Sequence, residues 1–553
     1  QRSLVGSEMC IRDRYRGYNA NGIAEQQSRR SSSYSNENVL TYIKKIGQHS
    51  LNVMVGSSLL YEENKTGSMT ARDFISDVYG YNNLDAGAQW DKPNTGRSKS
   101  TLLSGFGRIN YVLMDKYLFT VTGRADGSSK FGTNNKWAFF PSFAAAWRIN
   151  QEKFMKNIDW ISNLKIRGSW GVTGNQNIPA YSSPEKMNTY TYPIGGVTSV
   201  GIGAGNMPNP DLKWETTAIT DIGIDLGVFN NRINFTADYY YKKTTDLLWN
   251  ISVPLTTGFG TVLKNIGSLQ NKGLELSLSA DVLTGPFKWN TMLNWSTNKN
   301  KVLEIPGYIP TQQGTISGHL KVNGSWLEPG LPVGVWNLLK TNGVMRTEKE
   351  WQDAARVADS NFDKIGDMSF VDKNGDGKIS FGEDRQIVGD PNPDFIFGWT
   401  NNFSYKNFDL SVYINGSVGN DIYNVLRAET NIVSAWGNQR AEVKDRWTVN
   451  NPNGKYPRAH VLVNQNLLQS DYLIEDGSFL RIQNVTLGYT FPKVSFLRSL
   501  RIYATAQNLL TITGYSGYNP EVNSQGQSNL QLGVDYNAYP TARSFILGVN
   551  IGF

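Results

Sequence analysis

The sequence predicts an all-β protein built as an antiparallel β-barrel that crosses a membrane. Three observations lead to this prediction. Stretches of about ten residues alternate apolar and polar side chains along the chain, aromatic residues make up 12% of it, and its 553 residues contain no run of about 18 apolar residues. A membrane-spanning helix needs such a run, whereas a barrel strand is apolar on one face only. The 27 Tyr and 15 Trp are also typical of membrane–water interfaces.

The alternation is clearest in six internal stretches and at the C-terminal end. The internal stretches are LNVMV (51–55), LKIRGSWGV (164–172), INFTADYYY (233–241), LELSLSADV (274–282), FDLSVYING (408–416) and VTLGYTF (485–491). At the end of the chain, one face of the predicted strand carries Phe545, Leu547, Val549, Ile551 and Phe553, since side chains alternate with a period of two. Soluble antiparallel sandwiches are an alternative, although their strands are shorter, about 5–6 residues.

Short turns and long polar segments separate the predicted strands. FNNR (229–232) is a short turn, whereas about 56–100, 173–215, 303–400 and 420–470 are predicted as long loops, and GIGAGN (201–206) as part of one. Outer-membrane barrels show this asymmetry, with short periplasmic turns and long extracellular loops. The spacing leaves room for somewhat more than a dozen strands, whereas a plugged transporter barrel has about 22. We therefore expect a partial barrel.

The composition argues against an enzyme and against a nucleic-acid-binding protein. Cys10 is the only cysteine, and His49, His319 and His460 are the only histidines. The sequence has no HExxH, GxSxG or GxxxxGK[ST] motif. Carboxylates are numerous, but no sequence feature selects a pair with the spacing of a glycosidase. The formal charge of +7 is spread along the chain, so nucleic-acid binding has little support.

The first residues are treated separately. QRSLVGSEMCIRDR (1–14) carries charges throughout and lacks the apolar core of a signal peptide. We expect residues 1–14 to be a non-native segment, and residues 15–553 to be the C-terminal part of a longer barrel protein.

One motif indicates a metal site. VDKNGDGKISFGED matches the spacing of an EF-hand calcium loop, D-x-[DN]-x-[DN]-G-x₅-E. The predicted ligands are Asp372, Asn374, Asp376, the backbone carbonyl of Lys378, Ser380 and the bidentate carboxylate of Glu383. Such an all-oxygen set favours Ca²⁺ over Mg²⁺. The flanking sequence has no amphipathic helices, so we expect a structural Ca²⁺ site in an extracellular loop. The alternative is a solvated acidic turn.

Loop tryptophans have two interpretations. Trp326, Trp336 and Trp436 could stack on sugar rings, because aromatic faces pack on apolar ring faces. Packing inside the loops is at least as good an explanation for each.

Nine stretches along the chain carry a further signal. They are RADGSSKFGTNNKWAFFPSFAAAWRI (124–149), LKIRGSWGVTGNQNI (164–178), NPDLKWETT (209–217), DYYYKKTTDLL (238–248), NIGSLQNKGLELSL (265–278), GDPNPDFIFG (389–398), EDGSFLRIQNVTLGYTFP (475–492), AQNLLTITGYSGYNPEV (506–522) and TARSFILGVNIGF (541–553). Together they resemble one family, the SusC/RagA-like TonB-dependent transporters of the outer membrane. The resemblance runs in order from about Tyr15 to Phe553 and covers only the C-terminal barrel portion.

The resemblance implies a function and partners. The whole protein would import oligosaccharides or peptides across the outer membrane, with energy from a TonB complex and a SusD-like surface lipoprotein as lid. The signal peptide, TonB box, plug and first strands would lie upstream. The terminal strand ending on Phe553 resembles the signal that the barrel-assembly machinery recognises. Two alternatives stay open: a lidless TonB-dependent receptor for iron chelates or vitamins, and a surface glycan-binding β-protein or adhesin.

Overall fold

The computed structural model describes residues 9–10, 20–76, 78, 80–305, 311–316, 322–432, 438–492, 496–524, 530–536 and 538–553. His319, Trp436 and most of residues 1–14 lie outside the described residues. The chain divides into two compact units. Unit 1 gathers Gln1–Ala146, Ser169–Ile219 and Thr244–Gly267, and unit 2 gathers Trp147–Gly168, Thr220–Lys243 and Ser268–Phe553. Each unit is described by itself.

Unit 1 is built around long antiparallel strands. Its strands are β1 (Met9–Cys10), β2 (Ile23–Ile46), β3 (His49–Phe74), β4 (Gly87–Trp90), β5 (Asn94–Leu113), β6 (Tyr117–Ser128), β9 (Met187–Ile194), β10 (Val197–Ala204), β13 (Leu248–Ser252) and β14 (Thr261–Asn265). The pairings β2–β3, β3–β5 and β5–β6 join these strands into one antiparallel sheet, while β9–β10 and β13–β14 are separate hairpins. The strands β7 (Trp137–Arg148), β8 (Ile161–Asn175), β11 (Glu215–Val228) and β12 (Ile233–Thr245) contribute residues to both units.

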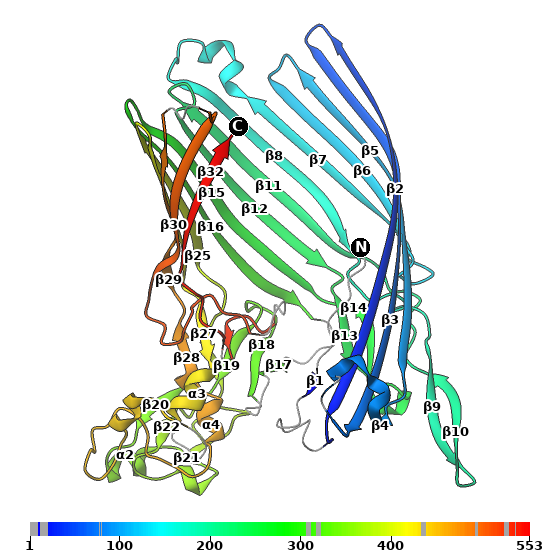
Figure 1. The fold of residues 1–553 in the computed structure, drawn as a ribbon, viewed down its shortest axis with the longest axis vertical. Coiled ribbons are helices and arrows are strands. Elements are labelled where there is room, and N and C mark those ends of the chain that lie inside the picture. Colours follow the sequence, from blue (N-terminus) through cyan, green and yellow to red (C-terminus); the bar gives the residue numbers. More distant parts are fainter. Residues whose placement is uncertain are drawn as a thin grey trace. The chain divides into compact units, whose positions relative to one another are not determined.

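Unit 2 contains a wall of seven strands, most of which are labelled in Figure 1. These are β15 (Ser268–Thr284), β16 (Phe287–Glu304), β25 (Phe395–Tyr405), β26 (Phe408–Val418), β29 (Phe479–Thr490), β30 (Ser499–Thr513) and β32 (Ser544–Gly552). Each pairs antiparallel with the next in this order. The stretches predicted within unit 2 as alternating strands fall in β15, β26, β29 and β32, which confirms those predictions.

Shorter elements lie in the segments that join the wall strands. The strands are β17 (Thr311–Ile316), β18 (Val322–Leu327), β19 (Val335–Leu338), β20 (Thr341–Val344), β21 (Arg356–Val357), β22 (Met368–Phe370), β23 (Lys378–Ile379), β24 (Gln386–Gly389), β27 (Asp421–Asn424), β28 (Ile474–Asp476) and β31 (Val534–Asp535). The α-helices are α2 (Glu348–Asp353), α3 (Val425–Asn431) and α4 (Gln465–Leu468). Of the helices in the described residues, none has the length and apolar character that crossing a membrane requires.

The register gives the wall one apolar and one polar face, because residues opposite each other in a ladder share a face. One row across the wall reads Leu278, Leu293, Trp399, Ile414, Ile482 and Leu510. The neighbouring row reads Ser277, Asn294, Gly398, Asn415, Arg481 and Thr511. On the apolar face, Leu487 is 51% exposed and Leu547 is 84% exposed. This exposure is what a lipid-facing surface requires.

Connections alternate between short and long. In the wall, residues 285–286 and 406–407 form tight turns, whereas 305–394, 419–478 and 514–543 are long. The FNNR turn is also confirmed: Phe229, Asn230 and Asn231 have φ of 54°, 59° and 59°, a left-handed conformation that asparagine tolerates better than most residues. The predicted asymmetry of turns and loops is therefore confirmed.

Two loop predictions were wrong. Most of residues 56–100 lie in β3 and β5, which leaves only 75–93 between β3 and β5, and residues 201–204 of GIGAGN belong to β10. Strands β2 and β3 have 24 and 26 residues, far more than the roughly ten that span a bilayer. A strand outside the membrane has no lipid-facing side, so its sequence need not alternate. Polar stretches such as YEENKTGSMT (61–70) therefore read as loop.

Three of the joining segments of unit 2 pack together into one body. We call residues 322–394, 420–478 and 514–536 the loop module. Its core contains Trp336, Leu338, Leu339, Val344, Val357, Met368, Phe370, Ile379, Tyr423, Val425, Ala428, Ile432, Leu467, Leu468, Leu473 and Val534. Because all three segments contribute to this core, the loop module is a small folded domain inserted between wall strands.

Candidate functional site

The wall's polar face carries a cavity of about 950 Å³, all of it within unit 2. Its floor is made by the row Ser277, Asn294, Gly398 and Asn415 and by the next row, Glu275, Ser296, Ile396, Ser417 and Phe479. Strand alternation places these side chains on the face opposite the leucine rows. The loop module contributes Pro391, Pro393, Asn420, Ile422, Leu532 and Gly533, together with residues 520–523.

Arg481 fixes one side of this cavity. It lies in the polar row of β29 and is 4% exposed. Its guanidinium donates to Glu521 Oε2 at 2.5 Å, to Asn519 Oδ1 at 2.6 Å and to Thr511 Oγ1 at 3.0 Å. Two of these partners belong to the segment between β30 and β32. Arg481 therefore ties residues 519–523, which line the cavity, to the strand wall.

A second guanidinium holds carboxylates of β11 and β12. Arg167 on β8 donates to Asp238 Oδ2 at 2.6 Å and to Asp221 Oδ1 at 3.3 Å. Lys165 lies 2.6 Å from Asp225 Oδ2. Lys165 and Arg167 are polar positions of the alternating stretch LKIRGSWGV, and these ion pairs agree with a polar face of β8. Charges on such a face are tolerated where the face meets water or protein rather than lipid.

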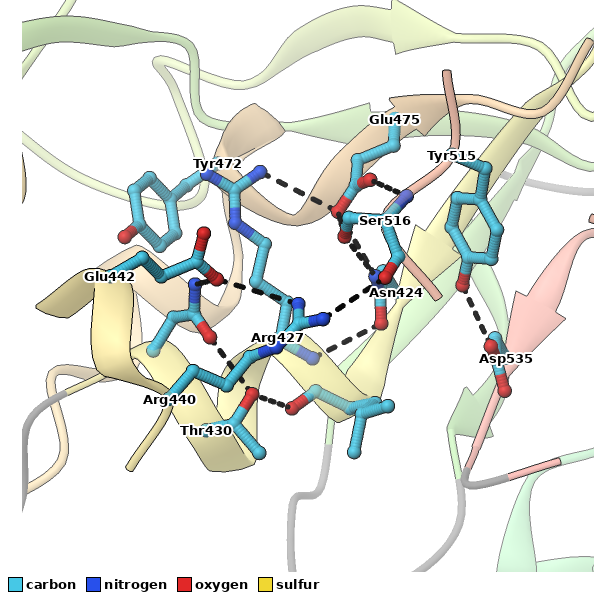
Figure 2. A network of polar contacts seen from close by, with 12 residues as sticks. Asn424, Arg427, Thr430, Arg440, Glu442, Tyr472, Glu475, Tyr515, Ser516 and Asp535 are labelled. Atoms are coloured by element: carbon cyan, nitrogen blue, oxygen red, sulfur yellow. Dashed lines mark hydrogen bonds and ion pairs between the residues drawn. The ribbon is translucent and has the colours of Figure 1, made fainter. Parts of the chain in front are cut away.

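The loop module is held by a polar network around α3, drawn in Figure 2. Glu475 is its centre: Oε1 accepts from Asn424 Nδ2 at 3.0 Å and from Ser516 Oγ at 2.9 Å, and Oε2 accepts from the Ser516 backbone N–H. Arg427 lies 3.6 Å from Glu475 Oε1, with its guanidinium 4.5 Å from the centre of the Tyr472 ring. The network joins the segment between β26 and β29 to the segment between β30 and β32.

Hydrogen bonding and burial shift the pKa values of three groups in this network. The Asn431 side chain donates to Glu442 Oε1 at 2.7 Å, and this hydrogen bond lowers the pKa of the Glu442 carboxyl. Burial raises the pKa of the Tyr472 phenol to about 12. Burial also raises the pKa of Tyr515, whose hydroxyl donates to Asp535 Oδ2 at 2.7 Å. These groups hold fixed protonation states at neutral pH and act as structural contacts.

The predicted calcium ligands lie in a turn of the loop module. Asp372 accepts backbone N–H groups of Gly375 at 2.7 Å and Gly377 at 2.8 Å, and both glycines have φ of +77°. Ser380 Oγ donates to Glu383 Oε2 at 3.3 Å. In the described part of the chain, no three His, Cys, Asp or Glu side chains gather closely enough to hold a metal ion. The donor atoms and the glycine turn suit Ca²⁺, and the calcium site stays a prediction.

The buried carboxylate of this turn was not predicted. Asp384, which directly follows the motif, is 0% exposed and accepts the backbone N–H groups of Lys373 and Ser380. Its position after Glu383 made it look like one more solvated acid. Only the fold shows that it closes the turn.

The remaining predicted residues lie on the C-terminal strand and in the loop module. Phe545, Leu547, Val549 and Ile551 lie on the exposed apolar face of β32, and Phe553 directly follows that strand. Trp326 and Trp336 are 6% and 0% exposed, so both pack inside the loop module and neither presents a face to a sugar. The cavity itself was not predicted, because no local motif marks residues that only the strand register brings together.

The wall has one lipid-compatible face and one polar face with a cavity, and its strands are joined by alternating short turns and long loops. These features define a β-barrel of the outer membrane. Comparison with known proteins agrees. The family model for the TonB dependent receptor-like beta-barrel matches residues 10–375. TonB-dependent receptor P3 of Formosa agariphila is 36% identical over 548 residues, which cover 97% of this chain and 54% of the relative. TonB-dependent receptor SusC of Bacteroides thetaiotaomicron is 33% identical over 546 residues, 93% of this chain and 49% of that protein.

A solved structure shows the same fold. The RagAB peptide transporter matches with a TM-score of 0.81 at 23% identity, covering 96% of this chain and 56% of that one. The chain belongs to the TonB-dependent receptor family, as its barrel portion, and its place is the outer membrane. Proteins of this family are transporters and not enzymes, as the sequence predicted. The chain spans about half the length of the curated relatives that it matches.

Proposed function

We propose that the full-length protein imports oligosaccharides or peptides across the outer membrane, driven by a TonB complex and assisted by a SusD-like surface lipoprotein. The observation that carries the proposal is the cavity on the wall's polar face, since a solute that crosses a barrel passes along that face. Membership of the receptor family and the similarity to SusC support it.

One hairpin supports a protein partner. Residues 187–204, which form β9 and β10, contain no charged residue. Ile194 is 66% exposed, Val200 63% and Ile202 74%, and β9–β10 is a sheet of two strands only. An isolated two-stranded hairpin is marginally stable in water, and exposed apolar surface often marks an interface. Figure 1 shows β9 and β10 as a ribbon that projects from unit 1. We assign this hairpin to the contact with the lipoprotein.

The C-terminal strand supports a second partner, the barrel-assembly machinery. β32 pairs with β30 only, among the described residues, and its apolar face is exposed along its length. Phe545, Leu547, Val549, Ile551 and Phe553 are the residues we expect that machinery to read.

Purification tests the proposal. The full-length gene is tagged in its native host, the protein is extracted from outer membranes in detergent, and co-purifying proteins are identified by mass spectrometry. A stoichiometric surface lipoprotein, lost when the hairpin 187–204 is replaced by a short Gly-Ser turn, is the expected result. A barrel that purifies alone would favour a receptor without a lid, for iron chelates or vitamins. Recovery in the soluble fraction would contradict the membrane assignment and favour a surface glycan-binding protein.

A further inference from the structure

The charges around the cavity are unevenly distributed. Among the described residues that line it, Asp238, Glu275 and Glu521 are acidic and none is Lys, Arg or His. Asp238 and Glu521 are held by guanidinium groups that stand outside the lining, those of Arg167 and Arg481. Glu275 is exposed to solvent. The lining is therefore acidic although the whole chain carries a formal charge of +7. Of the three carboxylates, Glu275 is the one without an ion pair among the described residues.

An aromatic ring forms part of the cavity floor. Tyr413 reaches across to the neighbouring strand, where a side chain at Gly398 would place its Cβ 3.2 Å from the Tyr413 hydroxyl oxygen and 3.5 Å from Cε2. The hydroxyl end of the ring therefore lies over the bare backbone of Gly398, and Tyr413 is 36% exposed. An exposed aromatic ring packs against the apolar face of a sugar ring.

Amides and hydroxyls line the same cavity. Asn294, Asn415, Ser277 and Ser417 all line the cavity. The Oδ1 atom of Asn415 is buried and has no hydrogen-bond partner within the described part of the chain. A buried acceptor without a donor is unfavourable, and a ligand hydroxyl that enters the cavity would supply one. The lining thus combines a stacking face with hydrogen-bonding groups that suit hydroxyls.

We propose that the cavity binds a stretch of uncharged, hydroxyl-rich sugar units, and that Glu275 keeps anionic ligands out. Tyr413 stacks on one sugar ring, and Asn415 accepts from a hydroxyl beside it. Glu275 lies three strands away on the cavity floor, where it accepts from a hydroxyl of another unit and repels carboxylate or sulfate groups. This inference rests on the proposed import function and narrows it to neutral oligosaccharides. Sulfated and uronic-acid oligosaccharides, and acidic peptides, are excluded by the same charge.

Thiol reactivity measures the charge of the cavity without a known substrate. Ser277→Cys is introduced into the full-length protein, with the other cysteines replaced by serine. Its reaction rates with a cationic trimethylammonium-ethyl and an anionic sulfonatoethyl methanethiosulfonate are compared, each normalised to a free thiol. A nearby unit charge predicts that the anionic reagent is slower by about tenfold. Glu275→Gln should bring the two rates within about threefold of each other, and Glu275→Asp should preserve the difference.

Three results would overturn the inference. Equal normalised rates in the Ser277→Cys protein would show that the cavity does not select by charge. A rate difference unchanged by Glu275→Gln would assign the selection to other groups. If neither reagent reacts, the rest of the full-length chain closes the cavity and no ligand reaches it.

Uptake tests the sugar assignment separately. In the native host, Tyr413→Phe should retain uptake of labelled neutral oligosaccharides and Tyr413→Ala should lose it at unchanged protein level. Import of peptides but not of neutral oligosaccharides by the unaltered protein would overturn the sugar assignment. A protein that imports nothing would contradict the proposed function, while the thiol rates would still report the charge of the cavity.

Discussion

Arg481 and Glu521 are 40 residues apart in sequence, and a 2.5 Å hydrogen bond joins the guanidinium of one to the carboxylate of the other. The arginine side chain is 5% exposed and the glutamate side chain 51% exposed. The pair connects a strand of the wall to a segment that lines the cavity. The position of that segment, and with it the shape of the cavity, therefore depends on where the strand pairing places Arg481.

Arg481→Gln should release that segment. A hydrogen bond to a charged group contributes about 1.5–3 kcal/mol, so local opening of residues 519–523 should become at least about tenfold more frequent. Amide hydrogen exchange of the full-length protein in detergent measures this directly. Arg501→Gln is the matched control, because Arg501 makes a two-bond contact with Asp409 elsewhere on the wall. Equal effects of the two variants on residues 519–523 would contradict the assigned role of Arg481.

The loop module should lose stability in acid through Glu442. Its pKa is lower in the folded protein than in the unfolded chain, so its contribution is present above the unfolded pKa of about 4.3 and is lost as pH falls through the folded pKa. Glu442→Gln should therefore increase amide exchange in α3 at pH 7, and the difference from the unaltered protein should shrink as pH falls below the unfolded pKa. Glu348→Gln, on the exposed helix α2, serves as control. A difference that does not shrink with falling pH would show that charge is not its cause.

Trp336 should be the most sensitive position of the loop module core. It is 0% exposed and lies 5.4 Å from Tyr423 between ring centres. Trp336→Ala should destabilise the loop module by about 3–5 kcal/mol, through lost packing and the cavity left behind. Trp336→Phe should cost much less, because the Trp336 Nε1 is buried with no hydrogen-bond partner among the described residues. Protease resistance of the loop module ranks the variants, and similar losses for both would contradict a packing role.

Calcium binding is testable on the predicted turn. Millimolar Ca²⁺ should protect residues 372–385 of the full-length protein from proteolysis, with Mg²⁺ less effective, since seven-fold oxygen coordination suits the larger ion. Asp372→Asn and Glu383→Gln should each remove the protection. Asp353→Asn, an acidic residue outside the motif, should leave it intact. If Ca²⁺ does not change the proteolysis of the unaltered protein, the calcium prediction is wrong and the motif is a solvated acidic turn.

The end of the chain should govern membrane assembly. Phe553→Ala, or removal of Phe553, should reduce the amount of folded protein in the outer membrane, because the terminal strand carries the apolar row that the assembly machinery is expected to read. Heat-modifiable migration in gels distinguishes folded from unfolded barrels. Phe496→Ala, which changes an exposed aromatic residue that precedes β30, is the control. Normal assembly without Phe553 would contradict the predicted signal.

The face on which each side chain lies was predictable from sequence where a strand lies in the membrane. Phe408, Leu410, Val412 and Ile414 alternate because one face meets lipid, and β26 follows that pattern from end to end. The same logic failed for the long strands of unit 1. Outside the bilayer both faces meet water, so alternation disappears and polar strands resemble loops.

The site was less predictable than the fold. Ser277, Asn294, Gly398 and Asn415 come from four strands and have no shared motif. Their common row depends on the pairing of each strand with the next, which a single sequence does not specify. The interpretation of Trp336 as a sugar-stacking residue was wrong for another reason. A tryptophan in a long loop segment looked available for a ligand, yet three loop segments pack around it. The alternation of apolar and polar residues does not reveal loop segments that form a hydrophobic core of their own.

One face of the wall meets lipid and the other meets water, and β26 allows this to be measured residue by residue. Single cysteines at Leu410, Ser411, Val412, Tyr413 and Ile414 of the full-length protein are labelled with a fluorophore in liposomes. Quenching is then measured with a lipid-bound and with a water-soluble quencher. We expect alternation: the label at 410, 412 and 414 is quenched from the lipid, and the label at 411 and 413 from water. Uniform quenching by the water-soluble reagent at all five positions would contradict it.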